Sequence, residues 1–354
     1  MTFEADSTHS PKHRTTDLRI ETKPLIEFGQ PVEMPFRDTT VAAQRDTQSG
    51  YVFFPAPNAE ELVEFYQAAY AEKQGSEYYQ IETDYESQKN IYHANRMLMR
   101  LRSIYGREPK SAIELGCAYG GLTAEMRRWG IDVTGYDLGE RSIEQGRKIK
   151  GNDRIFKASN LDALTLARDK VELIYTLHAL EHDPSFVEVI GKCRDVLTDD
   201  GLVFVSVPNA MFANAVLGGF RKNWWVAYPD HLHMLSPGFL PTLCDATGFE
   251  PIYWDTSIFF DVDPTFVEHF SLGSLAEPRK RIWEKLLGTA GHGMELNFVL
   301  APSGGVVARR LAATIRQIRL SLEAMCRREV EIRDFMEAAQ SPFGAPLPSS
   351  HSAS

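Results

Sequence analysis

The segment from Ser111 to Asp137 constrains the fold more than any other part of the chain. An apolar run ends at Leu115, a turn rich in glycine follows, and a second apolar run leads to Asp137. Glycine lets a backbone turn tightly and approach a ligand without a Cβ in the way. A strand, a glycine-rich turn, a helix and a second strand closed by an acid form a nucleoside-binding half-fold. The acid, about 20 residues after the glycines, holds a ribose.

The spacing of this turn separates it from a dinucleotide fingerprint, which reads G-x-G-x-x-G and places a pyrophosphate at the helix N-terminus. This chain has Glu114-x-Gly116-x-Ala118-x-Gly120, with an acid on the strand itself. The pattern resembles the first motif of class I S-adenosylmethionine-dependent methyltransferases, E/D-x-G-x-G-x-G, with alanine at the middle glycine. A carboxylate at this place suits a ligand that carries an ammonium and a sulfonium.

Three other segments resemble the same methyltransferases. LEHDPSF, from Leu180, is similar to L-E-H-x-x-D-P, and HLHMLSPGFL, from His231, is similar to H-x-x-x-F-S-P-x-x-L. A segment from Gly50 resembles one found upstream of the domain in bacterial sugar and natural-product methyltransferases. There it often follows a zinc ribbon, whose metal site cannot exist here because no cysteine precedes Cys117. The matches together cover about residues 50–301.

This resemblance implies an enzyme that uses S-adenosylmethionine to methylate a small molecule. The expected acceptor is a hydroxyl of a sugar or secondary metabolite, in natural product biosynthesis. A non-catalytic domain that binds the cofactor and acts as a scaffold is the alternative from another class. A short-chain dehydrogenase is excluded because its Tyr-x-x-x-Lys pair should follow the glycine-rich turn, whereas Tyr85 and Lys89 precede it.

Strand and helix signals alternate over about 190 residues from Ser111, which predicts an α/β fold with a parallel sheet. Val171 to Leu177 is almost continuously apolar, as in a strand buried on both faces. We expect a Rossmann-like, doubly wound sheet of seven strands. The resemblance implies that its last strand, Glu295 to Ala301, is antiparallel.

The chain divides into five expected parts. They are a mostly disordered leader over residues 1–50, an N-terminal helical lid over 51–105, the S-adenosylmethionine-binding domain over 106–302 with an insertion at about 257–292, a long amphipathic helix over 303–340, and a disordered tail over 341–354.

Composition bounds the function further. The net charge of −10 among 354 residues argues against a general nucleic-acid binder, whose affinity rests on neutralising phosphates. The four cysteines form no C-x-x-C pair and read as reduced residues of an intracellular protein. No apolar run approaches membrane-spanning length, and the N-terminus lacks a signal-peptide core. We therefore expect a cytoplasmic protein that binds neither nucleic acid nor membrane.

Ligands of a doubly wound sheet bind beyond the carboxyl ends of its strands, where the glycine-rich turn, Asp137 and the residues after later strands converge. The segment from Ser159 stands where these methyltransferases usually have Gly-Asp-x, whose side chain holds the adenine amino group. Asn160 can hydrogen-bond an adenine edge without that charge. The expected cofactor-binding residues are Glu114, Gly116, Cys117, Ala118, Tyr119, Gly120, Asp137, Leu138, Ser159, Asn160, Leu161 and Leu177.

Methyl transfer from a sulfonium is an in-line displacement, for which an enzyme supplies orientation and, for a protonated nucleophile, a base. His182 is the expected base because it follows the fourth strand and has the near-neutral pKa of histidine. Glu181, His178 and His231 are the other catalytic candidates. The expected substrate-binding residues are Trp224, Trp225, Tyr228 and His233.

A divalent metal is an alternative at the same place, although the first choice is a site without metal. Some quinone-precursor methyltransferases of similar sequence have E-x-x-E-H here, and this resemblance implies a metal that holds a phenolate. This chain has His178-Ala-Leu-Glu181-His182, so histidine replaces the first glutamate. Imidazole and carboxylate suit several divalent ions.

The C-terminal helix, from Val306 to about Ala339, contains neither proline nor glycine. Its apolar residues follow a heptad spacing, which requires burial against the same domain or against a second copy. We expect a homodimer through this seam, which consists of Leu311, Ile315, Ile318, Leu322, Met325, Ile332 and Met336.

Overall fold

The computed structural model describes residues 19–20, 23–24, 32–36, 39–46, 48–54, 84–211, 230–257 and 291–340. For residues 19–20, 23–24, 32–36, 39–42, 84–89, 149–150 and 328–340, it describes the backbone alone. Trp224, Trp225 and Tyr228 lie outside the described residues, as do most of the expected lid and insertion.

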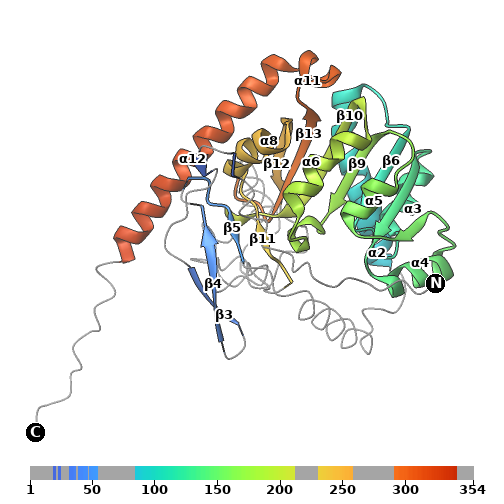
Figure 1. Ribbon diagram of the computed structural model, residues 1–354, viewed down its shortest axis with the longest axis horizontal. Helices are drawn as coiled ribbons and strands as arrows, with labels where there is room; N and C mark the ends of the chain where they lie inside the picture. The colour runs from blue at the N-terminus through green and yellow to red at the C-terminus, as the bar shows by residue number, and fades with distance from the viewer. Residues whose placement is uncertain are drawn as a thin grey trace, which may run out of the picture.

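A seven-stranded sheet forms the centre of the chain, in the order β12-β13-β10-β9-β6-β7-β8 (Figure 1). The pairs β10–β9, β9–β6, β6–β7 and β7–β8 are parallel, and β13 is antiparallel to both β10 and β12. This order confirms the predicted fold and its antiparallel last strand. The strands are β6 (Ser111–Leu115), β7 (Asp132–Asp137), β8 (Ile155–Lys157), β9 (Val171–Leu177), β10 (Leu197–Pro208), β12 (Phe249–Ser257) and β13 (Glu295–Pro302).

Helices cover both faces of the sheet because its strands are apolar on both sides. Along β10, Leu202 and Phe204 belong to one apolar cluster, whereas Val203 and Val205 belong to the other. α5 (Asn160–Leu166), α6 (Phe186–Val196) and α8 (Leu240–Thr247) pack on one face. α2 (Asp84–Tyr105), α3 (Gly121–Arg128) and α11 (Val306–Arg310) pack on the other. α4 (Glu140–Lys150) contacts β7 and β8.

The expected C-terminal helix is two helices, because α11 ends at Leu311 and α12 (Ala312–Gln340) follows. α12 lies along α8 and β12 (Figure 1). Ile315 is buried in the cluster that includes α2, and Leu322 is fully buried in the cluster that includes α6. The first half of the predicted seam therefore packs against its own domain, which weakens the argument for a dimer.

A second, four-stranded antiparallel sheet has the order β11-β5-β4-β3. Its strands are β3 (Val32–Phe36), β4 (Thr39–Arg45), β5 (Val52–Phe53) and β11 (His233–Met234), and β1 (Arg19–Ile20) pairs separately with β2 (Lys23–Pro24). Four of these strands, β1 to β4, lie in the segment expected to be a disordered leader, so that expectation is wrong for these residues. Strand preference depends on pairing partners, and here the partner of β5 lies about 180 residues further on.

The segment after β9 does not enter α6 directly. A 3₁₀ turn, η3 (Leu180–His182), comes first, and α6 begins at Phe186 with Ser185 as its N-cap. The Asp183 carboxylate accepts the amide of Ser185 at 2.8 Å. Asp183 therefore closes the turn that carries Glu181 and His182, and a second 3₁₀ turn, η5 (Pro237–Phe239), precedes α8.

Candidate active site

The glycine-rich turn between β6 and α3 depends on residues with positive φ. Gly116 has a φ of 76°, and a Cβ on it would overlap the Cβ of Ala179 in the segment before η3. Gly120 has a φ of 72°, and a Cβ on it would lie 2.6 Å from the side-chain nitrogen of Asn152. Ala118, at the middle glycine of the motif, also has a positive φ of 46°. This turn, called the glycine cradle below, therefore has no room for a side chain at Gly116 or Gly120.

Asp137 lies at the end of β7 and faces this turn. Its Oδ2 accepts the amide of Ala118 at 2.9 Å, and its Oδ1 accepts the amide of Gly139 at 2.7 Å. Burial raises the pKa of Asp137 above its ordinary value, although the two amides and His182 oppose this shift. A carboxylate oxygen has two lone pairs, so both oxygens keep capacity for ribose hydroxyls.

Glu114 stabilises the turn from beneath, because its carboxylate accepts the hydroxyls of Thr123 and Tyr175. Burial raises its pKa to about 7, against the opposing effect of these two hydrogen bonds. Cys117 is also buried, at 5% exposure, next to Gly135 of β7. Neither side chain faces the cradle, so their expected contacts with the cofactor reduce to the backbone.

The residues expected around the adenine are brought to the same edge but have partners of their own. Asn160 donates to Asp183 at 2.7 Å, and Ser159 caps α5 by accepting the amide of Asp162 at 3.1 Å. Leu161 is half-buried against α6's cluster, whereas Leu138 is 68% exposed directly after Asp137. The exposed side chain of Leu138, beside the Asp137 carboxylate, offers an apolar surface for an adenine ring.

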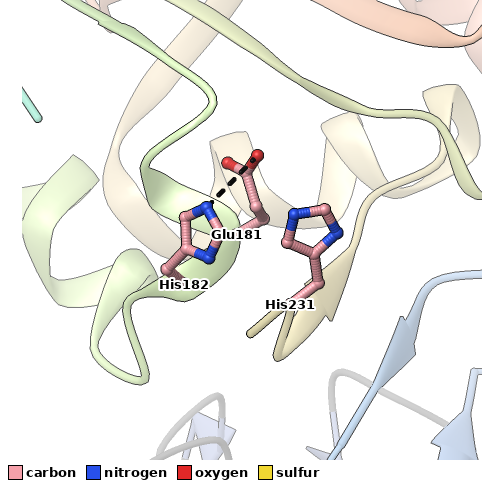
Figure 2. Close-up of side chains that lie close together, drawn as sticks. All are labelled: Glu181, His182 and His231. Atoms are coloured by element: carbon pink, nitrogen blue, oxygen red, sulfur yellow. Dashed lines mark ion pairs between the residues drawn. The ribbon is translucent and has the colours of Figure 1, made fainter. Parts of the chain in front are cut away.

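Glu181, His182 and His231 come together at this edge, with the two imidazoles on either side of the carboxylate (Figure 2). Their ligand atoms lie within 4.8 Å of one another, and the rings of His182 and His231 have centroids 4.8 Å apart. Glu181 is fully buried, and neither of its carboxylate oxygens has a hydrogen-bond partner among the described residues. A buried carboxylate without hydrogen bonds carries a large desolvation cost, which ion pairs with His178 and His182 offset here.

His178 lies on the other side of Glu181 and has a positive φ of 52°. Its Nδ1 is 3.4 Å from Oε1 of Glu181, and its Nε2 is 2.5 Å from Oε1 of Glu295, a fully buried residue at the start of β13. Arg96 of α2 also pairs with Glu295, at 3.3 Å. His178 therefore bridges two buried carboxylates, which removes it from the alternative metal site expected at His178, Glu181 and His182.

These neighbours set the charges of the cluster. Burial alone would lower the pKa of His182, but Asp230 and Glu181 outweigh it and raise that pKa to about 9. In the same way, Glu181 and Glu295 raise the pKa of His178 to about 10. The histidines hold the pKa of Glu181 below its usual value despite burial. The near-neutral pKa expected for His182 is therefore wrong, because two acidic side chains face it.

His233, expected to contact the substrate, lies in the protein core instead, at 1% exposure. Its ring packs against Phe186, with centroids 4.5 Å apart, and its Nδ1 forms a 2.8 Å hydrogen bond with the Tyr51 hydroxyl. Burial lowers its pKa to about 3. Three residues of the site were not predicted, namely Tyr51, Asp230 and Glu295. Among these, only Asp230 could have been found from the local sequence, because it adjoins His231.

The chain is similar in sequence to known methyltransferases. A family model for a methyltransferase domain matches residues 87–253. The ubiquinone biosynthesis O-methyltransferase of Dinoroseobacter shibae is 26% identical over 164 residues, which cover 42% of this chain and 66% of that protein. The protein of the same name from Sinorhizobium fredii is 25% identical over 173 residues, covering 44% and 69%. The chain thus spans about two thirds of the length of these relatives.

Solved structures are similar at low identity. The plantazolicin methyltransferase BamL, in complex with a triazolic desmethylPZN analog and SAH, is 15% identical, with a TM-score of 0.43 over 60% of this chain and 84% of that chain. A SAM-dependent methyltransferase from Archaeoglobus fulgidus is also 15% identical, with a TM-score of 0.41 over 60% of this chain and 93% of that chain.

In the part of this chain that the structure describes, no helix is long and apolar enough to span a membrane.

Proposed function

We propose that this chain, whose residues 87–253 are a methyltransferase domain, transfers the methyl group of S-adenosylmethionine to a hydroxyl of a small molecule. One observation carries the proposal. The glycine cradle with Asp137 and the Glu181–His182–His231 cluster lie at the same edge of the sheet, beyond the carboxyl ends of β6, β7 and β9. Ligands of such sheets bind at this edge.

The cradle and the cluster fit two different parts of the reaction. The amides of the glycine-rich turn and Asp137 suit the nucleoside and its charged substituents, and the cofactor supplies the electrophilic methyl group. The cluster suits the acceptor: an acceptor hydroxyl must lose its proton as it attacks, and a positioned side chain can take that proton. In His182, Nδ1 is engaged with the carbonyl of Asp230 at 2.7 Å. Its Nε2 is therefore the atom that accepts the proton, in the neutral form of the imidazole, which becomes the major form above a pH of about 9.

A divalent cation in the cluster is a second candidate, and it is favoured because neither carboxylate oxygen of buried Glu181 accepts a hydrogen bond from the described residues. The three residues offer one carboxylate and two imidazole ligands, a donor set that suits several divalent metals. Asp230 would orient His182 from the second coordination shell. When bound, such a cation would lower the pKa of an acceptor hydroxyl. In this set of ligands, His231 stands in place of His178, which was the expected third ligand.

The class of acceptor follows from the relatives only as a proposal. Relatives named ubiquinone biosynthesis O-methyltransferases make a phenolic hydroxyl a reasonable first choice. The sequence resemblance to sugar and natural-product methyltransferases makes a sugar hydroxyl the second. Both acceptors present a hydroxyl whose proton the cluster removes.

The test is release of S-adenosylhomocysteine from S-adenosylmethionine, measured by mass spectrometry with a panel of catechols, phenols and sugar nucleotides. We expect product with at least one acceptor, and a rate lowered about 100-fold or more in His182→Gln, because a positioned base contributes that much. Lys192→Gln, which removes an exposed salt bridge on α6, should leave the rate unchanged.

A chelator separates the two candidates. Activity that EDTA abolishes and Mg²⁺ or Mn²⁺ restores favours the cation, whereas activity indifferent to EDTA favours His182 as a metal-free base. Tight cofactor binding with no turnover of any acceptor, with or without divalent metal, would contradict the proposal and favour the non-catalytic scaffold.

The proposed homodimer involves only the second half of α12. Ile315 and Leu322 are covered by their own domain, and the seam resumes at Ile332 and Met336. A concentration-dependent molecular mass in ultracentrifugation, lost on substitution of both residues by serine, would support the dimer. A monomer at every concentration would exclude it.

A further inference from the structure

The short segment from Asp230 to Ser236 brings His231 to the candidate active site, and neighbours hold it along its length. His182 Nδ1 hydrogen-bonds the carbonyl of Asp230, and the amide of Leu232 donates to the carbonyl of Glu181 at 2.8 Å. Ser236 donates its hydroxyl to the carbonyl of Ser49. The position of His231 therefore depends on where this segment lies.

On its other side, the segment pairs with a strand from the N-terminal part of the chain. β5 and β11 lie side by side (Figure 1), with Phe53 opposite His233 and Val52 opposite Met234. The amide of Phe54 also donates to the carbonyl of Leu232 at 2.8 Å. Leu232 thus links Glu181 to the N-terminal segment through its own amide and carbonyl.

Tyr51, the residue before β5, adds a side-chain hydrogen bond to β11. Its hydroxyl lies 2.8 Å from Nδ1 of His233, and both side chains are buried. The phenol can donate to this imidazole nitrogen or accept from it, because the roles follow the tautomer of His233. The Tyr51 ring stacks on Phe239, with centroids 4.1 Å apart.

The turn that immediately precedes Tyr51 is itself held by hydrogen bonds. The Asp46 carboxylate accepts the amides of Gln48 and Ser49, at 3.2 Å and 3.1 Å, and is only 2% exposed. This turn also presents the Ser49 carbonyl to Ser236. The pairing of β5 with β11 is therefore braced at both of its ends.

We propose that Tyr51 is a positioning residue of the candidate active site, which holds His231 against Glu181 and His182 through its hydrogen bond to His233. The inference rests on the proposed function for its consequence in catalysis. Tyr51 lies upstream of the matched methyltransferase domain, residues 87–253. The domain's own cluster is therefore completed by a segment outside it.

The experiment reads the position of His231 without requiring turnover. In the full-length protein with isotope-labelled histidine, the rings of His182 and His231, 4.8 Å apart, should give a nuclear Overhauser cross-peak. Tyr51→Phe keeps the stacking ring and removes the hydroxyl, and we expect the cross-peak to be lost. Tyr105→Phe is the matched control, because it removes a 2.6 Å hydrogen bond to the carbonyl of Glu172 at the opposite end of β9; it should keep the cross-peak.

His233 gives a second pair of variants should Tyr51→Phe fold poorly. In His233→Asn the side-chain oxygen can accept the Tyr51 hydroxyl in place of Nδ1, so the cross-peak should persist. In His233→Leu no acceptor remains, so it should disappear. Calorimetric binding of S-adenosylhomocysteine should match wild type in all variants. A cross-peak retained in both Tyr51→Phe and His233→Leu would overturn the proposal.

Catalysis provides the second readout. Once an acceptor is known, Tyr51→Phe should lower kcat about 10-fold, as loss of a residue behind a site residue typically does, with KM for S-adenosylmethionine unchanged. If no variant or wild type transfers a methyl group, the proposed function fails while the cross-peak still decides the role of Tyr51.

Discussion

Gly116 and Gly130 both have a positive φ, but only Gly116 has a neighbour where a Cβ would lie. Gly130→Ala should cost about 1 kcal/mol, the strain of a left-handed alanine. Gly116→Ala should cost clearly more, because its Cβ would also overlap Ala179. It should weaken S-adenosylhomocysteine binding as well, since the cradle must move. Urea denaturation and calorimetry measure both effects; equal costs and equal affinities would contradict this role of Gly116.

The charge of the histidine cluster predicts how stability depends on pH. The pKa of His182, raised from 6.5 to about 9, and that of His178, raised to about 10, mean that both imidazolium ions stabilise the folded state. This contribution is complete below about pH 6.5 and is lost as pH rises through 9 to 10. The melting temperature of the chelator-treated protein should therefore fall over this range.

Glu181→Gln removes the carboxylate shared by both histidines, so its melting temperature should fall less steeply between pH 7 and pH 10. Glu125→Gln, a mostly buried carboxylate on α3 that pairs with Arg128, is the control and should keep the wild-type slope. Identical slopes in Glu181→Gln and wild type would show that Glu181 does not raise the pKa of the two histidines.

Motifs supplied the residues of the site but not their partners. Glu181 and His182 were assigned because they follow a buried strand, and the structure places them beside His231. Glu295, by contrast, meets His178 across 117 residues. A contact of such separation depends on the order of strands in the sheet, which no local pattern encodes.

At the level of single elements, two helix N-caps form a matched pair. Ser159 accepts the amide of Asp162 at the start of α5, whereas Ser185 at the start of α6 makes no side-chain cap. Ser159→Ala should therefore lower the free energy of unfolding by about 1 kcal/mol, and Ser185→Ala should change it by much less. Chemical denaturation measures both, and a larger loss in Ser185→Ala would contradict the capping geometry.

Elements with a strong period or a glycine boundary could be predicted, and those that depend on distant pairing could not. The strand from Val171 and the strand that ends at the glycine-rich turn were both expected and are both present. The strands β3, β4 and β5 were not predicted, because they form one sheet with β11, which pairs with β5 and lies far along the chain. The helix expected from Val306 breaks at Leu311 because the chain must turn from α11 into α12.

The whole molecule is held together partly by α12, which contributes to both faces of the sheet. Leu322 is fully buried on it, and Leu320 is 51% exposed two residues earlier. Leu322→Ala should therefore cost about 2–5 kcal/mol through the lost contacts and the cavity. Leu320→Ala should cost less than about 0.5 kcal/mol. Similar costs for the two variants would show that α12 does not pack on the domain in solution.

The heptad spacing predicted a buried stripe but could not identify what buries it. A seam of Ile315, Ile318 and Leu322 suits a second helix of another copy as well as the edge of its own sheet. The structure assigns these residues to the chain itself. Only the arrangement of α8 and β12, which α12 contacts, decides between these two outcomes.

The central claim is that the cradle at Gly116 and Asp137 binds S-adenosylmethionine. Its most direct test is calorimetric titration of the full-length protein with S-adenosylmethionine, alongside Asp137→Ala. We expect saturable binding of one molecule per chain, weakened about 10- to 100-fold in Asp137→Ala by loss of charge-assisted hydrogen bonds. The exposed Asp153→Ala should bind as wild type does. No binding, or equal binding by Asp137→Ala and wild type, would contradict the account.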